Sequence, residues 1–263
     1  MPENSSDQAH KKRKGGNSWQ KARAHTPRSS IERGDWGVFV TCERGRETKC
    51  AAEIVDLFNQ NVGQPEKGGD EAESDEDEDD IETQIKKEIE GLKPNTQKSS
   101  LFEVVKFDLP CIIFVKFDKS IDPEKLVHQM CLDAHANPDQ KRSRYVQRLT
   151  PARSIRKTLS VDLEEFAREI LKPHFHSGGP PKKYAIRPSL RGNKKFGRDA
   201  IIKTVADLVG PEHPVDLKNY DLVILVDVVQ NIMSMSVVGS DYDKLRRFSL
   251  AELYSPGSAP QEA

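Results

Sequence analysis

The order of apolar segments in the first half of the chain restricts its possible folds more than any other feature. Gly37–Cys42 is a short apolar run typical of a buried strand, and apolar residues then recur at helical spacing between Ala51 and Phe58. Two strand-like runs follow, Leu101–Phe107 and Cys111–Phe117, with turn residues around Pro110 between them. This part of the sequence therefore predicts a strand, a helix and a β-hairpin.

A second helix and a last strand complete the pattern. Asp122-Pro123 is a typical helix start, an apolar stripe runs from Leu126 to Ala134, and Asn137-Pro138 is expected to end the helix. Ser143–Leu149 can then supply a fourth strand. The order strand, helix, hairpin, helix, strand is that of the split β-α-β arrangement. We therefore expect an α+β fold with a ferredoxin-like domain over residues 35–150.

A second α+β unit is expected over residues 151–254. Ser160 is a candidate N-cap for a helix with one apolar face, and Pro173 is expected to end that helix. Apolar patterns then predict a strand, a helix and two more strands, in the order Lys183–Arg187, Arg198–Val209, Leu222–Val229 and Ile232–Val238. Of the last two strands, the first is almost wholly apolar and should be buried on both faces, whereas the second alternates.

Three segments have compositions that do not favour a packed core. Residues 1–34 form a polar basic arm, and its run Lys11–Lys14 is either a nuclear localisation signal or a solvated tail. An acidic run near residues 63–80 repels itself and is expected to be a disordered insertion, and residues 255–263 should be a disordered tail. We expect the protein in the nucleus and nucleolus, and also in the cytoplasm.

The net charge of −1 conceals two opposed blocks, an acidic one from Glu66 to Glu90 and a basic one from Lys141 to Arg198. Basic blocks favour nucleic acids because contacts of Lys and Arg with phosphates dominate the affinity. Arg187 and Arg191 are the leading candidates, since guanidinium groups can bind phosphate with two hydrogen bonds or stack on bases. They precede the start of a predicted helix, whose amide groups favour an anion. A solvated basic face is the alternative for each residue. The predicted RNA-binding residues are Arg153, Arg156, Lys157, Lys183, Arg187, Arg191, Lys194, Lys195 and Arg198.

Catalytic, cofactor and metal motifs are not found in the sequence. It contains neither Gly-x-Gly-x-x-Gly nor a Walker phosphate loop, and its four cysteines have no Cys-x-x-Cys spacing and are expected to be reduced thiols. His174 and His176 lack the accompanying carboxylates or thiols of a metal site. The longest apolar run, Leu222–Val229, is much shorter than the roughly 20 residues that a membrane helix needs. We therefore expect no enzyme, no cofactor and no membrane segment.

Several separated motifs occur in an order typical of one family. They are Gly37–Glu47, Arg148–Pro151, His213–Asn231, Met235–Val238 and Asp241-Tyr242. Together they resemble the eukaryotic THUMP-domain adaptors of tRNA acetylation, and the resemblance covers roughly residues 35–254. Only a short tail follows Tyr254, so no fused catalytic domain is expected.

The resemblance implies a ferredoxin-like domain and a THUMP domain that together hold the acceptor end of tRNA. It also implies an adaptor without catalytic residues or cofactors. Its partners would be serine and leucine tRNAs and a separate RNA cytidine acetyltransferase that forms N4-acetylcytidine in the D-arm. Two alternatives stay open: a ribosome-assembly factor that binds precursor rRNA, and an RNA-modifying enzyme with an unrecognised site.

Overall fold

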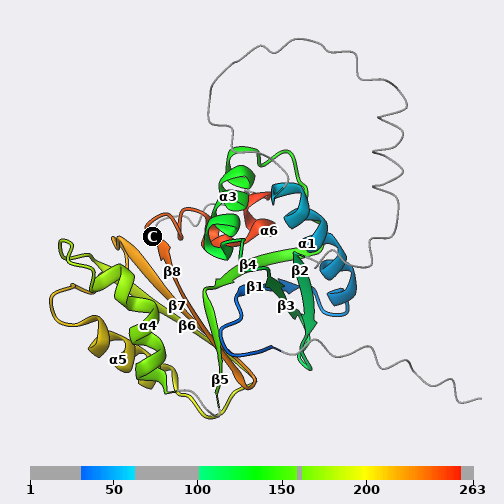
Figure 1. The fold of residues 1–263 in the computed structure, drawn as a ribbon. Coiled ribbons are helices and arrows are strands. Elements are labelled where there is room, and N and C mark those ends of the chain that lie inside the picture. Colours follow the sequence, from blue (N-terminus) through cyan, green and yellow to red (C-terminus); the bar gives the residue numbers. More distant parts are fainter. Residues whose placement is uncertain (1–30, 63–100, 159–161, 256–263) are drawn as a thin grey trace, which may run out of the picture.

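Two four-stranded sheets form the framework of the protein, one from each half of the chain (Figure 1). The structure is a computed structural model that describes residues 31–62, 101–158 and 162–255. Several predicted segments lie outside these residues, namely the basic arm up to residue 30, the acidic insertion near 63–80 and the tail from residue 256.

The first sheet comes from the first half of the chain. Its unit contains β1 (Gly37–Cys42), α1 (Glu47–Val62), β2 (Phe102–Lys106), β3 (Ile112–Phe117), α3 (Pro123–Ala136) and β4 (Val146–Ala152). The strand order is β2-β3-β1-β4, and every neighbouring pair is antiparallel. Both helices cover the same face, where Val40 and Val115 share a core with Ile54 and Val127. We call residues 31–152 the first unit.

The start of α3 follows the sequence prediction. Asp122 Oδ1 accepts hydrogen bonds from the backbone N of Glu124 (2.9 Å) and of Lys125 (3.2 Å). These bonds satisfy two amide groups that have no partner within the helix. Pro123 suits the first helical position, because its φ is already helical and its missing N–H needs no partner there. Local sequence therefore determines where α3 begins.

The second sheet has the strand order β5-β8-β7-β6, with β6 and β7 parallel and the other pairs antiparallel. Its unit, residues 153–239, contains β5 (Ser154–Lys157), α4 (Leu163–Phe175), β6 (Tyr184–Arg191), α5 (Arg198–Val209), β7 (Leu222–Val229) and β8 (Ile232–Gly239). Figure 1 shows α4 and α5 together on one face of this sheet. The chain then returns to the first unit through η1 (Arg246–Phe248) and α6 (Leu250–Leu253), which pack beside β4.

Helix α4 differs from its prediction at both ends. Its N-cap is Asp162, whose side chain accepts from the backbone N of Glu164 and Glu165, whereas Ser160 lies outside the described residues. The helix also continues past Pro173 to Phe175. Phe175 is buried against the ring of Tyr184, with ring centroids 5.6 Å apart, and this packing helps to hold the last turn despite the proline.

The strands of the second unit also differ from expectation. Strand β5 was not predicted, since four residues are too few to show a pattern. Strand β6 extends past Arg187 to Arg191 and includes Pro188. An edge strand tolerates proline, because the missing N–H costs no hydrogen bond between the inner strands of the sheet. The alternation expected for β8 does not produce an exposed face, because Ser234 and Ser236 are buried too.

The second face of this sheet packs against the first unit, which explains the burial of β8. Phe39 and Phe114 share a core with Val229 and Ile232. Ser236 Oγ donates a hydrogen bond of 2.7 Å to the carbonyl of Pro151. A single residue separates β4 from β5, so the chain passes directly from one sheet to the other. The two units therefore share one interface.

Candidate nucleic-acid interface

The two faces of edge strand β6 have different surroundings. Tyr184 and Ile186 belong to the core beneath α4 and α5. Successive side chains of a strand point to opposite faces, so Arg187, Ser189 and Arg191 lie on the face that is turned away from these helices. This arrangement places two of the predicted arginines on the side of the second sheet that faces the first unit.

One row of residues crosses the whole second sheet at the carboxyl end of β6. In register, Lys157 is paired with Ile232, Ile232 with Val229, and Val229 with Arg191. Residues in register point to the same face, and three strand spacings separate the two ends of the row by about 14 Å. Ile232 and Val229 are buried against the first unit, whereas Lys157 and Arg191 are exposed. The row thus carries a cation on each edge strand.

The loop between β6 and α5 brings further cations to this end of the sheet. Asn193 Oδ1 accepts from the backbone N of Lys195 (2.8 Å) and of Phe196 (3.1 Å), which gives the loop a defined shape. Lys195 Nζ donates to the carbonyl of Thr158, next to Lys157, and Arg198 Nη1 donates to the carbonyl of Pro188 (2.9 Å). We call this group the basic end of the second sheet; its members are Lys157, Arg191, Lys194, Lys195 and Arg198.

The first unit reaches the basic end through the turn between β2 and β3. Gly192 has a φ of +63°, and a Cβ at this position would lie 3.2 Å from Leu109 Cδ1. Glycine therefore suits both the left-handed backbone and the close approach of Leu109. Both units consequently border the surface next to Arg191.

Arg187 and Asp227 lie on the same face as Arg191. Arg187 Nη2 donates to the carbonyl of Leu217 (3.0 Å), and its side chain is 28% exposed. Asp227 is paired with Ser189 across β6 and β7. Burial raises the pKa of Asp227 to about 6, although a hydrogen bond to Ser189 and the charge of Arg191 act in the opposite direction. The Asp227 carboxylate thus offsets part of the positive charge on this face.

Lys183 lies at the other end of the sheet. It precedes the first residue of β6, so it is about 26 Å from Arg191 along the strand direction. Its Nζ contacts Asp216 Oδ2 at 3.3 Å. Arg153, in the link between the sheets, donates to Asp122 Oδ2 at 2.8 Å and stacks over the ring of Trp36. The structure therefore does not bring these two residues to the basic end.

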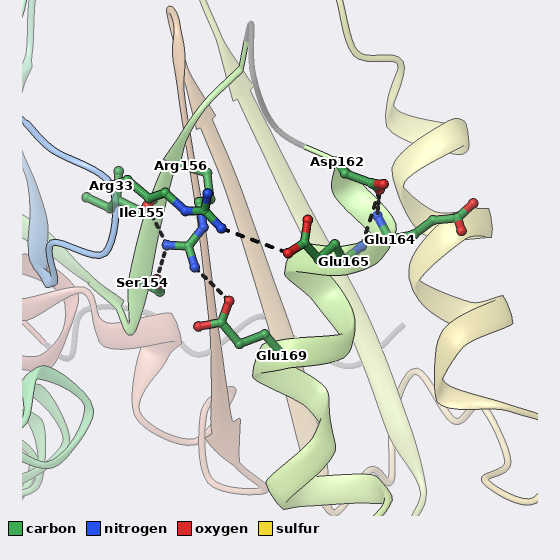
Figure 2. Close-up of polar contacts among 8 residues, drawn as sticks. All are labelled: Arg33, Ser154, Ile155, Arg156, Asp162, Glu164, Glu165 and Glu169. Atoms are coloured by element: carbon green, nitrogen blue, oxygen red, sulfur yellow. Dashed lines mark hydrogen bonds and ion pairs between the residues drawn. The ribbon is translucent and has the colours of Figure 1, made fainter.

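Arg156 points to the helical face of the second sheet (Figure 2). Its Nη2 contacts Glu169 Oε2 at 2.6 Å, its Nη1 donates to Ser154 Oγ at 2.8 Å, and the guanidinium lies 5.0 Å from the centroid of the Phe166 ring. The side chain is only 11% exposed. These contacts favour a role of Arg156 in joining β5 to α4.

Neither a membrane segment nor a metal centre is found in the part of the chain that the structure describes. No helix there is long and apolar enough to cross a membrane. No group of three or more His, Cys, Asp or Glu side chains in the same residues could hold a metal ion. All four cysteines are unpaired, and burial raises the pKa of the Cys50 and Cys131 thiols.

Comparison with known proteins shows the family of this chain. Residues 160–238 match the THUMP domain. The tRNA acetyltransferase TAN1 of Saccharomyces cerevisiae is 34% identical over 250 residues, which cover 85% of this chain and 86% of that protein. The chain belongs to the THUMP-domain tRNA acetylation adaptor family. An uncharacterized protein of Schizosaccharomyces pombe is 38% identical over 86% of this chain and 78% of its own length. THUMP domain-containing protein 1 of Bos taurus is 30% identical over 85% of this chain and 64% of its own length.

The THUMP match contains most of the predicted RNA-binding residues but not all of the arginines near them. It includes β6, the following loop and the start of α5, and therefore four of the five members of the basic end. Two further arginines flank the match. Arg148 of β4 contacts Glu252 Oε1 at 3.3 Å, and Arg247 of η1 contacts Asp243 Oδ1 at 2.9 Å. Sequence analysis missed Arg247 as a candidate, because only the return of the chain through η1 brings it to Asp243, which Arg187 also contacts.

Proposed function

We propose that this THUMP-domain protein binds tRNA through the basic end of the second sheet and presents it to a separate acetyltransferase. The observation that carries the proposal is the convergence of five cations at one end of the sheet, beside the first unit. Similarity to TAN1, which is named a tRNA acetyltransferase, supports tRNA as the RNA. Lys and Arg side chains at this end can neutralise the phosphates of a folded RNA.

Recognition would use the shape and backbone of the RNA. The major groove of an A-form helix is too deep and narrow for side chains to read its bases. Cations at strand ends and in a short loop suit contacts with successive phosphates. A bound tRNA would then be held close to the acetyltransferase, which raises the effective concentration of substrate at that enzyme. On this proposal the chain itself performs no chemistry.

The proposed partners are serine and leucine tRNAs and an RNA cytidine acetyltransferase that forms N4-acetylcytidine in the D-arm. We also propose that the first unit is a ferredoxin-like domain that holds the acceptor end together with the THUMP domain. The strand order β2-β3-β1-β4, with antiparallel neighbours and both helices on one face, supports this assignment. The close approach of Leu109 to the backbone at Gly192 supports a shared RNA surface.

The main experiment measures N4-acetylcytidine in tRNA from cells that lack this protein. We expect the modification to disappear from serine and leucine tRNAs and to return with the wild-type gene. Purified protein incubated with tRNA and an acetyl donor should form no acetylcytidine until the acetyltransferase is added. Unchanged acetylation in the deletion strain would refute the adaptor role, and product formation by the chain alone would make it the enzyme.

Crosslinking and sequencing of the bound RNA separates tRNA binding from ribosome assembly. The proposal requires tRNA reads, with crosslinks in the acceptor stem. Abundant precursor rRNA without tRNA would instead support the ribosome-assembly function.

The proposed location is the nucleus, including the nucleolus, with a further pool in the cytoplasm. The basic run Lys11–Lys14 suggests this location, although it lies outside the described residues. A fluorescent fusion with these four residues changed to alanine should lose its nuclear signal, whereas the unchanged fusion should keep it. Equal distributions of the two fusions would remove this run as the signal.

A further inference from the structure

Asp243 is a carboxylate on which three donors converge. Tyr220 donates its hydroxyl to Asp243 Oδ2 at 2.7 Å, and Arg247 Nε donates to Oδ1 at 2.9 Å. Arg187 Nη2 lies 3.8 Å from Oδ2. The donors come from β6, from the segment before β7 and from η1. Tertiary structure therefore assembles an anion site that an internal carboxylate occupies.

Electrostatics keep this carboxylate ionised. Burial raises the pKa of Asp243, but hydrogen bonds from Tyr220 and Arg247 and the charges of both arginines outweigh burial and lower it. Burial, and then the hydrogen bond to Asp243, raise the pKa of Tyr220, so its hydroxyl keeps the proton that it donates. The site thus favours an anion at neutral pH.

The anion site is open to solvent and has unused donor capacity. The side chains of Arg187, Asp243 and Arg247 are 28%, 40% and 58% exposed. Arg187 Nε is buried and has no hydrogen-bond partner within the described structure. A guanidinium carries five N–H donors, and an oxyanion with several acceptor atoms can engage more of them than one carboxylate does here.

A strained turn presents Arg247 to this site. Arg246, Arg247 and Phe248 have φ values of 51°, 56° and 58°, in the left-handed region that L residues rarely adopt. Phe248 is fully buried, with its ring centroid 5.0 Å from that of Tyr242, and this packing holds the turn. Three such residues in succession mark the turn as a candidate functional feature, because strained backbone persists only where the surrounding structure holds it.

We propose that Asp243 is an internal substitute for an RNA phosphate, and that it leaves Arg187, Arg247 and Tyr220 when a phosphodiester binds to them. This inference rests on the proposed tRNA binding. Phosphate is the favoured ligand because it accepts paired hydrogen bonds from arginine, as a carboxylate does, and because Arg191 continues the cations along the same face of β6. Asp243 thereby weakens RNA binding until a correctly placed phosphate displaces it.

The test compares the tRNA affinity of Asp243→Asn with that of the wild-type chain in about 150 mM salt. Asparagine keeps the size and the acceptor for Tyr220 but removes the competing charge. We expect binding to tighten roughly three- to tenfold, as for the loss of one close competing charge. Asp207→Asn is the matched control, since it makes the same charge change at an exposed position on α5. This helix covers the face of the sheet opposite to Arg187. It should change the affinity less than about twofold.

A double-mutant cycle adds a second readout. Arg247→Ala should weaken binding more in the Asp243→Asn background than in the wild-type chain, because Arg247 is then free to contact phosphate. Equal effects of Asp243→Asn and Asp207→Asn, or additive effects of Asp243→Asn and Arg247→Ala, would overturn the proposal while leaving tRNA binding intact. Failure of the wild-type chain to bind tRNA would overturn both.

NMR of the arginine Nε groups in the full chain identifies the ligand and does not depend on the stability of a variant. Adding tRNA should shift the resonances of Arg187 and Arg247, and the Arg168 resonance from the opposite side of the sheet should stay unchanged. Shifts on addition of a polyglutamate peptide but not of tRNA would assign the site to an acidic protein partner and overturn the proposal.

Discussion

Replacing Arg191 and Lys194 with alanine should make tRNA binding less sensitive to salt. Both side chains are exposed at the basic end, so their removal costs little burial and should leave the fold intact. Each Lys or Arg that neutralises a phosphate releases condensed counterions, which contributes roughly 0.7 to 0.9 to the slope of log affinity against log salt. The slope therefore counts the phosphate contacts that a variant has lost.

The expected size of the effect follows from two contacts. The slope should become shallower by roughly 1.4 to 1.8 in the double variant. Between 50 and 200 mM salt, a fourfold change, the wild-type chain should lose roughly 7- to 12-fold more affinity than the double variant loses. At low salt the variant should be the weaker binder.

Fluorescence anisotropy of a labelled serine tRNA over a potassium chloride series measures both slopes. The matched control replaces Arg168 and Lys172 with alanine, which removes two exposed positive charges from α4 on the helical face. The control should keep the wild-type slope, and melting temperatures should be similar for all three proteins. Equal slopes for the two double variants would show that the basic end does not contact phosphate.

Three further predictions concern stability and are measured by urea unfolding. Glu124 Oε1 accepts from the backbone N of Val237 in β8, and burial raises its pKa from 4.5 to about 7. The carboxyl of Glu124 therefore stays protonated to a higher pH in the folded state than in the unfolded state. The free energy of unfolding should fall by up to about 3 kcal/mol as pH rises from 4.5 to 7. Glu124→Gln should remove that fall. Parallel plots of the free energy of unfolding against pH for the variant and the wild-type chain would contradict this prediction. Asp162→Ala should cost about 1 kcal/mol by removing the cap of α4, and an unchanged unfolding midpoint would show that the cap is dispensable. Phe248→Ala should cost about 3–5 kcal/mol, whereas a loss below about 1 kcal/mol would mean that the strained turn is held by other contacts.

Elements with strong local signals were predictable from the sequence. Asp122-Pro123 starts α3 as expected, because a capping side chain and a proline act within a few residues. Leu222–Val229 is a strand buried on both faces, which its nearly continuous apolar run indicated. Strand β5 escaped prediction, since its pairing with β8 depends on residues almost 80 positions away. The extension of α4 past Pro173 depends in the same way on the packing of Phe175.

The sequence by itself determined that residues 141–198 form a basic block, because charge is a property of the residues themselves. Arg187 and Arg191 share one face of a strand only because β6 continues to Arg191, past the end that the sequence predicted. Only the tertiary structure decided which cations meet. Pairing across four strands places Lys157 in the same row as Arg191, whereas Glu169 and Asp122 engage Arg156 and Arg153. The return of the chain through η1 brings Arg247 and Asp243 to Arg187. Such contacts join residues far apart in the chain, and no local pattern records them.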